Sequence, residues 1–266
     1  MGRGFRVKIA VISDIHSNLE ALRVVLNDID QQQVDRIYCV GDVVGYGPNP
    51  CECLDLVMQR CEVCVSGNHD LAAFGKPDGF NPSAGEAIFW TQDRISQSRR
   101  SDEYWVFLGD RNPTHTTGHF LFAHGSPSNP ANEYLFPEDV WSGQAKLDRN
   151  FAMVNRCAFV GHTHVPGIFT SPRNFIETSE LNGPYELPEF GRRAIVNVGS
   201  VGQPRDGDPR ACYVTVTFPG DTPGADDGGE LLRYHRLEYP LEETIAKIHQ
   251  IPGVNNFLGD RLREGR

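Results

Sequence analysis

Five short apolar runs in this chain each end directly in residues that can bind a metal ion. The runs VKIAVIS, RIYCVG, CVSG, HFLFA and CAFVG are followed by DIH, D, NHD, HG and HTH. Short runs rich in β-branched and aromatic residues predict buried strands. Ligand crevices form beyond the carboxyl ends of strands in open α/β sheets. The sequence therefore predicts that these polar residues, spread between positions 14 and 164, meet at one site.

The pattern along the chain predicts an α/β protein whose second half is more antiparallel. In the first half, apolar runs alternate with helical patterns, as in α/β sheets. Residues 19–29 have one apolar helical face that Ser17 or Asn18 can cap, and a second helix is expected near Pro50 with Asn49 as its cap. Three later β-like runs have no long helix between them, which favours antiparallel pairing. They are residues 194–198, 212–217 and 231–239.

Five further segments are expected to lie outside this main pattern. Residues 82–98 have a helical pattern, and the polar, Pro-rich start of 125–150 suggests a loop that covers something. Residues 171–193 are rich in Pro, Gly and charge and are expected to form an excursion. A mobile hairpin loop is expected over 218–230, and a short surface helix after residue 241.

Length and charge limit the class of protein. A chain of 266 residues can bury a core without disulfides or a structural metal, and no linker divides it, so we expect one domain over residues 1–266. The 25 Lys and Arg against 35 Asp and Glu give a net charge of −10. This charge repels phosphate backbones, so stable nucleic-acid binding is not expected. No apolar run approaches the roughly 20 residues of a membrane helix, no secretory signal is evident, and the seven cysteines are an odd number; these features favour a cytoplasmic protein with reduced thiols.

The donor set after the strands indicates a divalent metal centre. It contains two Asp, one Asn and four His, a mixture suited to Mn, Fe, Zn or Ni. Seven donors are too many for one tetrahedral zinc ion. Two ions about 3.5 to 4 Å apart that share a carboxylate would use all of them, and such pairs activate water for phosphoryl displacement. The donors are Asp14, His16, Asp42, Asn68, His124, His162 and His164.

The motifs DIH, GD, GNHD, HG and GHTH, in this order, resemble those of the calcineurin-like metallophosphoesterase superfamily over about residues 7–206. The segments VGDVVGYGPNP, SGNHDLA, AHGSP and NVGSVGQPRDGD resemble in particular its small bacterial phosphodiesterase branch, which includes diadenosine-polyphosphate hydrolases. The resemblance implies a four-layer α/β/β/α sandwich, in which two facing mixed sheets are flanked by helices. It also implies a small phosphate ester or dinucleoside polyphosphate as substrate. The chain has GDVVGYG where phosphoprotein phosphatases have GDxxDRG, so the arginine used there to bind phosphate is absent.

The resemblance also implies a role for each motif residue. Asp14, His16 and His164 would hold a first metal ion, and Asn68, His124 and His162 a second. Asp42 would bridge the two ions, for which manganese is the favoured element. A hydroxide that bridges the metals would attack phosphorus, and His69 would protonate the leaving alkoxide, as a positioned general acid can.

Simpler explanations remain for several residues outside this set. The cysteines of CEC and CEVC, at residues 51–53 and 61–64, could suggest zinc, but residues two apart on a helix point to different faces, so thiols without function are favoured. Arg205 either contacts an anionic substrate or forms an ion pair or turn with Asp206. The other histidines are expected to be hydrogen-bonded structural residues; they are His115, His119, His235 and His249.

Two rival functions are considered beside the phosphoesterase. A catalytically silent scaffold that keeps the metal site is disfavoured by the intact His69. A nuclease subunit of the double-strand-break repair type shares the metal motifs, but the acidic balance and the lack of an extended basic or coiled-coil segment disfavour it. The sequence leaves open the native metal, the preference for monoesters or diesters, and the oligomeric state.

Overall fold

The computed structural model describes residues 6–219 and 229–266, and within them two six-stranded sheets face each other. The first sheet has the order β3 (Val63–Cys64), β2 (Arg36–Cys39), β1 (Arg6–Ile12), β11 (Ala211–Pro219), β12 (Leu231–Leu237), β9 (Tyr185–Glu186). The second has the order β4 (Thr114–Thr117), β5 (Phe120–Ala123), β6 (Cys157–Val160), β10 (Ala194–Asn197), β7 (Gly167–Thr170), β8 (Asn174–Glu177). Both sheets are mixed, with parallel and antiparallel pairs.

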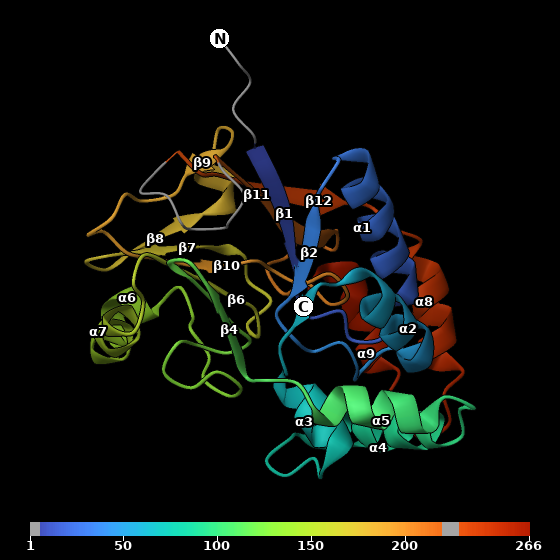
Figure 1. Ribbon diagram of the computed structural model, residues 1–266. Coiled ribbons are helices and arrows are strands. Elements are labelled where there is room, and N and C mark those ends of the chain that lie inside the picture. Colours follow the sequence, from blue (N-terminus) through green and yellow to red (C-terminus); the bar gives the residue numbers. More distant parts are fainter. Residues whose placement is uncertain (1–5, 220–228) are drawn as a thin grey trace.

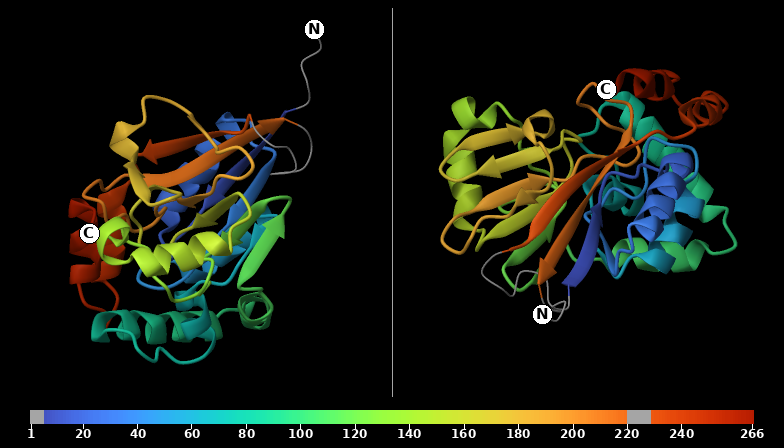
Figure 2. Two further views of the ribbon diagram at one scale, coloured as in Figure 1. Left: turned by 90° about the vertical axis from the view of Figure 1, so that its left-hand side faces the viewer. Right: turned by 90° about the horizontal axis from the view of Figure 1, so that it is seen from above.

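Helices cover the outer faces of the two sheets (Figure 1). Those of the first part of the chain are α1 (Leu19–Gln31), α2 (Pro50–Arg60), α3 (Asn68–Phe74), α4 (Pro82–Ser96) and α5 (Ser101–Gly109). Later come α6 (Asp139–Ser142), α7 (Gln144–Ala152), α8 (Leu241–His249), α9 (Phe257–Asp260) and the 3-10 turns η1 (Thr178–Glu180) and η2 (Arg261–Glu264). The right-hand view of Figure 2 shows α6 and α7 outside one sheet and α1 and α2 outside the other. The four-layer sandwich that the resemblance implies is confirmed.

Alternation along the strands creates the layers. In β1, Val7, Ile9 and Val11 point into the core between the sheets, whereas Ala10 and Ile12 face the helices. β6 follows the same rule, because Phe159 lies in the central core and Val160 lies under the helical layer of the second sheet. Successive side chains of a strand point to opposite faces. Strands that are apolar on both faces therefore read as continuous apolar runs, which is how they stand in the sequence.

Parallel pairing brings the predicted donor residues to one edge. β1 pairs in parallel with β2, with Ile12 opposite Cys39, so the residues that follow both strands emerge side by side. β5, β6 and β10 are likewise parallel to one another in the second sheet. The carboxyl ends of these strands open onto the same region, as Figure 1 shows for β1 and β2 beside β6 and β10.

Several local predictions differ from the structure. Asn18 caps α1 through its side chain, as expected, but Asn49 precedes α2 without a cap hydrogen bond and binds Glu52 instead. The segment 125–150 contains α6 and α7, and the excursion 171–193 contains β8, η1 and β9, because these short elements complete a layer or a sheet edge. The region after residue 241 forms α8, α9 and η2, whose Ile245, Leu258 and Leu262 are buried. The predicted hairpin loop over 218–230 lies mostly on residues 220–228, outside the described residues.

The helices of the described segments include none that is both long and apolar enough to span a bilayer.

A buried ion pair joins the two sheets at the end away from the predicted site. Arg156, just before β6, pairs with Glu230, just before β12, and both side chains are fully buried. One guanidinium nitrogen, Nη1, donates to Glu230 Oε1 at 2.6 Å, and Nε donates to the Pro188 carbonyl at 2.7 Å. Removal of one partner would leave an uncompensated buried charge.

We expect Glu230→Gln to lower the free energy of unfolding by about 3 to 5 kcal/mol, the usual effect of breaking a buried pair. Glu62→Gln is the control, because Glu62 pairs with Arg36 at 3.5 Å on the surface with half of its side chain exposed, and exposed pairs contribute about 1 kcal/mol or less. Denaturant unfolding of both variants measures the difference. Equal losses in the two variants would contradict the stabilising role of the buried pair.

Candidate metal centre

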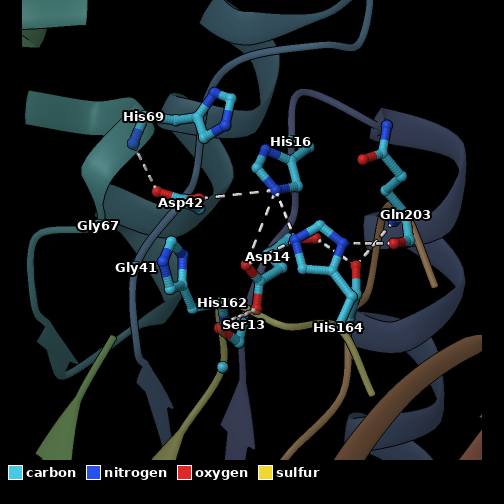
Figure 3. Close-up of polar contacts among 12 residues, drawn as sticks. Ser13, Asp14, His16, Gly41, Asp42, Gly67, His69, His162, His164 and Gln203 are labelled. Carbon is cyan, nitrogen blue, oxygen red and sulfur yellow. Dashed lines mark hydrogen bonds and ion pairs between the residues drawn. The ribbon is translucent and has the colours of Figure 1, made fainter. Parts of the chain in front are cut away.

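The structure brings all seven predicted donor residues together at the carboxyl ends of the strands. Figure 3 shows Asp14, His16, Asp42, His162 and His164 directed toward one another from the loops after β1, β2 and β6. Six of the seven predicted donors, together with His69, form three overlapping groups whose possible ligand atoms all lie within 4.8 Å of one another: Asp14, His16 and His164; His16, Asp42 and His69; Asp42, His124 and His162. All of these residues are buried.

The first cluster joins Asp14, His16 and His164. Asp14 Oδ1 lies 3.1 Å from His164 Nε2 and 3.7 Å from His16 Nε2, and the two imidazole nitrogens are 3.1 Å apart. Asp14 Oδ1 is buried and has no hydrogen-bond partner in the described part of the chain, whereas Oδ2 accepts from Ser13 Oγ and the His162 amide. One carboxylate oxygen is thus held by the protein, and the other is left for a cation.

The second cluster joins Asp42, Asn68, His124 and His162. His124 Nε2 lies 3.1 Å from Asn68 Oδ1, 3.0 Å from His162 Nδ1 and 3.2 Å from Asp42 Oδ2. The same oxygen, Asp42 Oδ2, lies 3.6 Å from His16 Nε2 in the first cluster. Asp42 is therefore the residue that the two clusters share.

Backbone carbonyls determine which nitrogen of each imidazole faces the centre. Nδ1 of His16 contacts the Val44 carbonyl at 3.2 Å, Nδ1 of His124 contacts the Val40 carbonyl at 2.9 Å, and Nδ1 of His164 contacts the Gln203 carbonyl. Because a carbonyl only accepts, each Nδ1 must donate, and in a neutral ring the Nε2 then presents a lone pair to the centre. Bare lone pairs of His16 and His164 then face each other at 3.1 Å. Such an arrangement needs a cation between the acceptors, so the donor set fits divalent metal ions.

The ionisation of the histidines agrees with this arrangement. Burial lowers the pKa of His162 to about 2 and that of His164 to about 4, and it holds the pKa of His16 well below its usual value. These rings are therefore neutral at pH 7, as metal ligands must be. His124 differs. Burial lowers its pKa, but the Asp42 carboxylate outweighs this effect and raises the pKa of His124 to about 9. Burial in turn raises the pKa of Asp42 to about 6. The carboxylate thus favours a positive charge on His124, at the position where a metal ion would supply one.

The backbone around the donors is held in an uncommon conformation. Asp14, His16, Asp42, His162 and His164 all have φ between +47° and +67°. Non-glycine residues adopt this left-handed region uncommonly, Asp and His more readily than most, and a cluster of them is typical of a functional site where the surrounding structure compensates. Asp70 contributes to that support, because its carboxylate accepts from the amides of Val43, Val44 and Gly67. Asp70 belongs to the GNHD motif, although the sequence analysis assigned it no role.

His69 lies beside both the clusters and an open cavity. Its amide donates to Asp42 Oδ1 at 2.9 Å, and its ring is 4.8 Å from the His16 ring. It lines a cavity of about 330 Å³ together with Tyr46, Asn68, Phe80, Tyr134 and His162. His69 Nδ1 is buried without a hydrogen-bond partner among the described residues. Burial lowers the pKa of His69 well below its usual value. The ring is thus beside a space where a ligand can enter.

Two aromatic residues of the site were missed by the sequence analysis. The Tyr134 ring stacks on His162 with centroids 3.6 Å apart, and Tyr46 packs against His69 at 4.4 Å. Tyr134 belongs to the segment 125–150, which the sequence predicts to be a covering loop, and its ring lies over His162 of the second cluster. Tyr46 stands in the segment GDVVGYG, which is notable in the sequence only for the absent arginine.

Other predicted residues fall as follows. Arg205 donates to Gln203 Oε1, and Asp206 pairs with Arg236 instead of Arg205. All seven cysteines are free, and no cluster of possible ligands in residues 6–219 and 229–266 includes a cysteine. The four other histidines lie outside the clusters; His235 contacts Thr215 and His249 contacts Asp260.

Comparison with known proteins agrees with the geometry. Residues 7–220 match the calcineurin-like phosphoesterase superfamily domain. An uncharacterized protein of Methanocaldococcus jannaschii is 37% identical over 265 residues, covering 97% of this chain and 98% of that protein. A metallophosphoesterase from Sphaerobacter thermophilus superposes with a TM-score of 0.78 at 34% identity, covering 98% of this chain and 100% of that one. A hypothetical protein of Pyrococcus horikoshii shares the fold, with a TM-score of 0.72 at 16% identity over 98% and 99% of the two chains.

The chain therefore belongs to the calcineurin-like phosphoesterase superfamily, as its motifs predict. With its cluster of buried Asp and His donors, it is a metal-dependent phosphoesterase.

Gly67 provides a test of how closely the site is packed. A Cβ at this position would lie 2.1 Å from Asp42 Oδ1 and 2.3 Å from the Asp42 amide nitrogen. We expect Gly67→Ala to displace Asp42, to weaken divalent metal binding, and to lower the free energy of unfolding by about 1 to 3 kcal/mol, the cost of overpacking. Calorimetric Mn²⁺ titration and thermal unfolding measure the two effects.

The matched control is Gly85→Ala in α4, where a Cβ would have no neighbour within 4 Å. Alanine is the better helix former there, so this variant should be as stable as the parent or more stable by up to about 1 kcal/mol. If both variants bound metal with the same affinity and unfolded at the same temperature, the close approach of Gly67 to Asp42 would not be needed for metal binding or stability.

Proposed function

We propose that this phosphoesterase uses two divalent ions to hydrolyse phosphodiesters or dinucleoside polyphosphates. The observation that carries the proposal is the pair of donor clusters with Asp42 Oδ2 in common, 3.6 Å from His16 Nε2 on one side and 3.2 Å from His124 Nε2 on the other. Shared carboxylates are typical of two-metal phosphoryl-transfer sites.

The chain's residues would divide the work as the family resemblance implies. Asp14, His16 and His164 would hold one ion, Asn68, His124 and His162 the other, and Asp42 both. When bound, the ions supply Lewis acidity, which lowers the pKa of water and neutralises charge on a phosphate ester. Stacking of Tyr134 over His162 keeps bulk water from one side of the centre.

His69 is proposed as the general acid that protonates the leaving alkoxide. It opens onto the cavity, and its amide rather than its ring holds Asp42. A phosphate ester in this cavity would raise the pKa of the neighbouring imidazole by its negative charge, against the lowering by burial, and so keep on the ring the proton that the role requires. The ring belongs to one of the three donor groups, and its assignment to chemistry instead of ligation therefore needs the direct test below.

Arg205 is proposed as a residue that contacts the substrate.

We also propose that residues 1–266 act as one domain, because α8 packs against α1 through Thr244, which donates to Asn18 and Glu20. Manganese as the favoured ion and a cytoplasmic location stay predictions.

A substrate screen tests the proposed class. The protein is reconstituted with Mn²⁺ and assayed on monoesters, phosphodiesters, cyclic nucleotides, dinucleoside polyphosphates and duplex DNA, with a chelator-treated sample beside it. We expect metal-dependent turnover of diesters or dinucleoside polyphosphates. Turnover of DNA alone would favour the repair-type nuclease, and binding of two metals without turnover of any ester would favour the silent scaffold.

The shared role of Asp42 predicts that Asp42→Asn impairs both metal sites at once. If the amide oxygen accepts from the His69 amide, the NH₂ group faces the clusters and repels a cation. We expect affinity for both ions to fall by at least the 10- to 100-fold that is typical even of outer-shell losses. His162→Ala should lower the affinity for mainly one of the two ions. Elemental analysis after dialysis counts the metals, and two ions retained at parental affinity in Asp42→Asn would refute the sharing.

The general-acid role predicts an effect of His69→Ala that depends on the leaving group. We expect both ions to be kept while turnover of an alkyl diester falls by roughly 10²- to 10⁴-fold. A p-nitrophenyl ester, whose leaving group needs little protonation, should lose much less. Steady-state rates on the two esters and metal content of the same sample are compared; loss of metal, or equal losses on both esters, would assign His69 to ligation.

A further inference from the structure

Two arginines from distant parts of the chain converge beside the metal centre. Arg205 lies in the loop after β10, and Arg261 begins η2 near the end of the chain. Nη2 of each donates to the same atom, Gln203 Oε1, at 2.7 Å for Arg205 and 2.5 Å for Arg261. Both guanidinium groups also lie over the Tyr46 ring, 5.7 Å and 4.8 Å from its centroid.

No carboxylate forms an ion pair with either arginine within residues 6–219 and 229–266. The acidic residues nearest to them in sequence pair with other side chains: Asp206 with Arg236, and Asp260 with His249 and Arg263. The side-chain partners of the two guanidiniums in this part of the chain are neutral: both contact Gln203 and Tyr46, and Arg261 also lies over Phe257. Two cations on one neutral acceptor repel each other, and an anion between them would relieve that repulsion.

Each guanidinium retains unused donors. The Nε atoms of Arg205 and Arg261 are buried and have no hydrogen-bond partner among the described residues. Burial, together with the positive charge of Arg205, lowers the pKa of Arg261 to about 10. A guanidinium presents a planar fork of N–H groups that matches a phosphate. The pair is thus an anion site for which the protein supplies no anion of its own.

The arginine pair borders the cluster of Asp14, His16 and His164. The Tyr46 ring, which both guanidiniums face, lies 4.7 Å from the His16 ring and 4.4 Å from the His69 ring. The amide of Arg205 also donates to the His164 carbonyl at 3.3 Å. An anion held by the pair would therefore sit next to a phosphate at the metals.

The C-terminal segment holds Arg261 in place. Leu258 and Leu262 pack in one buried cluster with Tyr46 and Ile245, and Gly207 donates its amide to the Gly265 carbonyl at 3.0 Å. This segment lies beyond residue 220, where the match to the family domain ends. Arg261 is thus a feature of this chain that the shared motifs do not supply.

We propose that Arg205 and Arg261 form a subsite for a second phosphoryl group, adjacent to the one at the metal centre. This inference rests on the proposed function and narrows it to substrates with linked phosphoryl groups, such as dinucleoside polyphosphates. Arg261 then determines specificity between such substrates and simple esters.

The test compares two ligands that differ by one phosphoryl group, AMP and α,β-methylene-ADP, whose P–C–P bridge resists hydrolysis. Their affinities for the metal-loaded protein are measured by calorimetry, without need for turnover. We expect the parent protein to prefer α,β-methylene-ADP and Arg261→Gln to reduce that preference roughly 10-fold or more, as loss of a charged hydrogen bond to phosphate would. Arg261→Lys, which keeps the charge without the fork, should retain part of it.

Arg266→Gln is the matched control, because Arg266 is on the same segment with 76% of its side chain exposed, and it should leave the preference unchanged. Equal changes for both ligands in Arg261→Gln, or none, would overturn the subsite. Should Arg261→Gln fail to fold by circular dichroism, Arg261→Lys and Arg205→Lys decide, since a preference that survives intact in both would also overturn it. A parallel assay on a dinucleoside polyphosphate and a nitrophenyl diester separates the two proposals: no turnover of any ester refutes the function, whereas turnover without an effect of Arg261 refutes only the subsite.

Discussion

The site depends on one constraint: several atoms that can donate a lone pair to a metal ion are held close together around Asp42 in a buried region. Imidazole nitrogens and carboxylate oxygens from both sheets lie 3.0 to 3.7 Å apart, and the Nε2 lone pairs of the neutral His16 and His164 face each other. In a buried region this repulsion is costly unless cations are bound. The surrounding structure holds the donors in this arrangement against that cost. Carbonyls orient the imidazoles, Asp70 accepts from three amides, and five donor residues keep a positive φ.

The sandwich provides the stiffness that such an arrangement requires. The two sheets share a core of β-branched and aromatic residues, so loops from β1 and β2 are fixed relative to loops from β5 and β6. The buried pair of Arg156 and Glu230 joins the sheets at the opposite end. The donor loops can therefore be irregular and strained while the distances between them stay set by the strands.

In the proposed phosphoryl subsite, the C-terminal segment contributes to substrate recognition at the metal centre. The donor residues all lie within the part of the chain that matches the family domain. Arg261 reaches the same site from outside that part, and it packs against Tyr46, a residue of the loop after β2. In the proposed arrangement, the metal-binding residues and the residue that selects the substrate thus come from different parts of the chain, which is how one fold can serve several substrates.

The sequence by itself determined the strands, the donors and the family. Strands can be predicted from local sequence, because a short apolar run bounded by turn residues is typical of a buried strand. Residues that directly follow parallel strands lie at the same edge of the sheet, so the meeting of the donor residues follows from the strand prediction. The central strands and the meeting of the seven donor residues were therefore predictable. The helices α3 and α5 and the strands β4, β8 and β9 were not. β4 and β8 are four-residue edge strands of mixed polarity that pair with their sequence neighbours β5 and β7, and the two-residue β9 pairs with the distant β12. Only the tertiary structure decided that Asp42 Oδ2 faces both clusters, that Tyr134 covers His162, and that Arg261 joins Arg205. These facts depend on side-chain directions and on contacts across the whole length of the chain, which no local pattern of residues encodes.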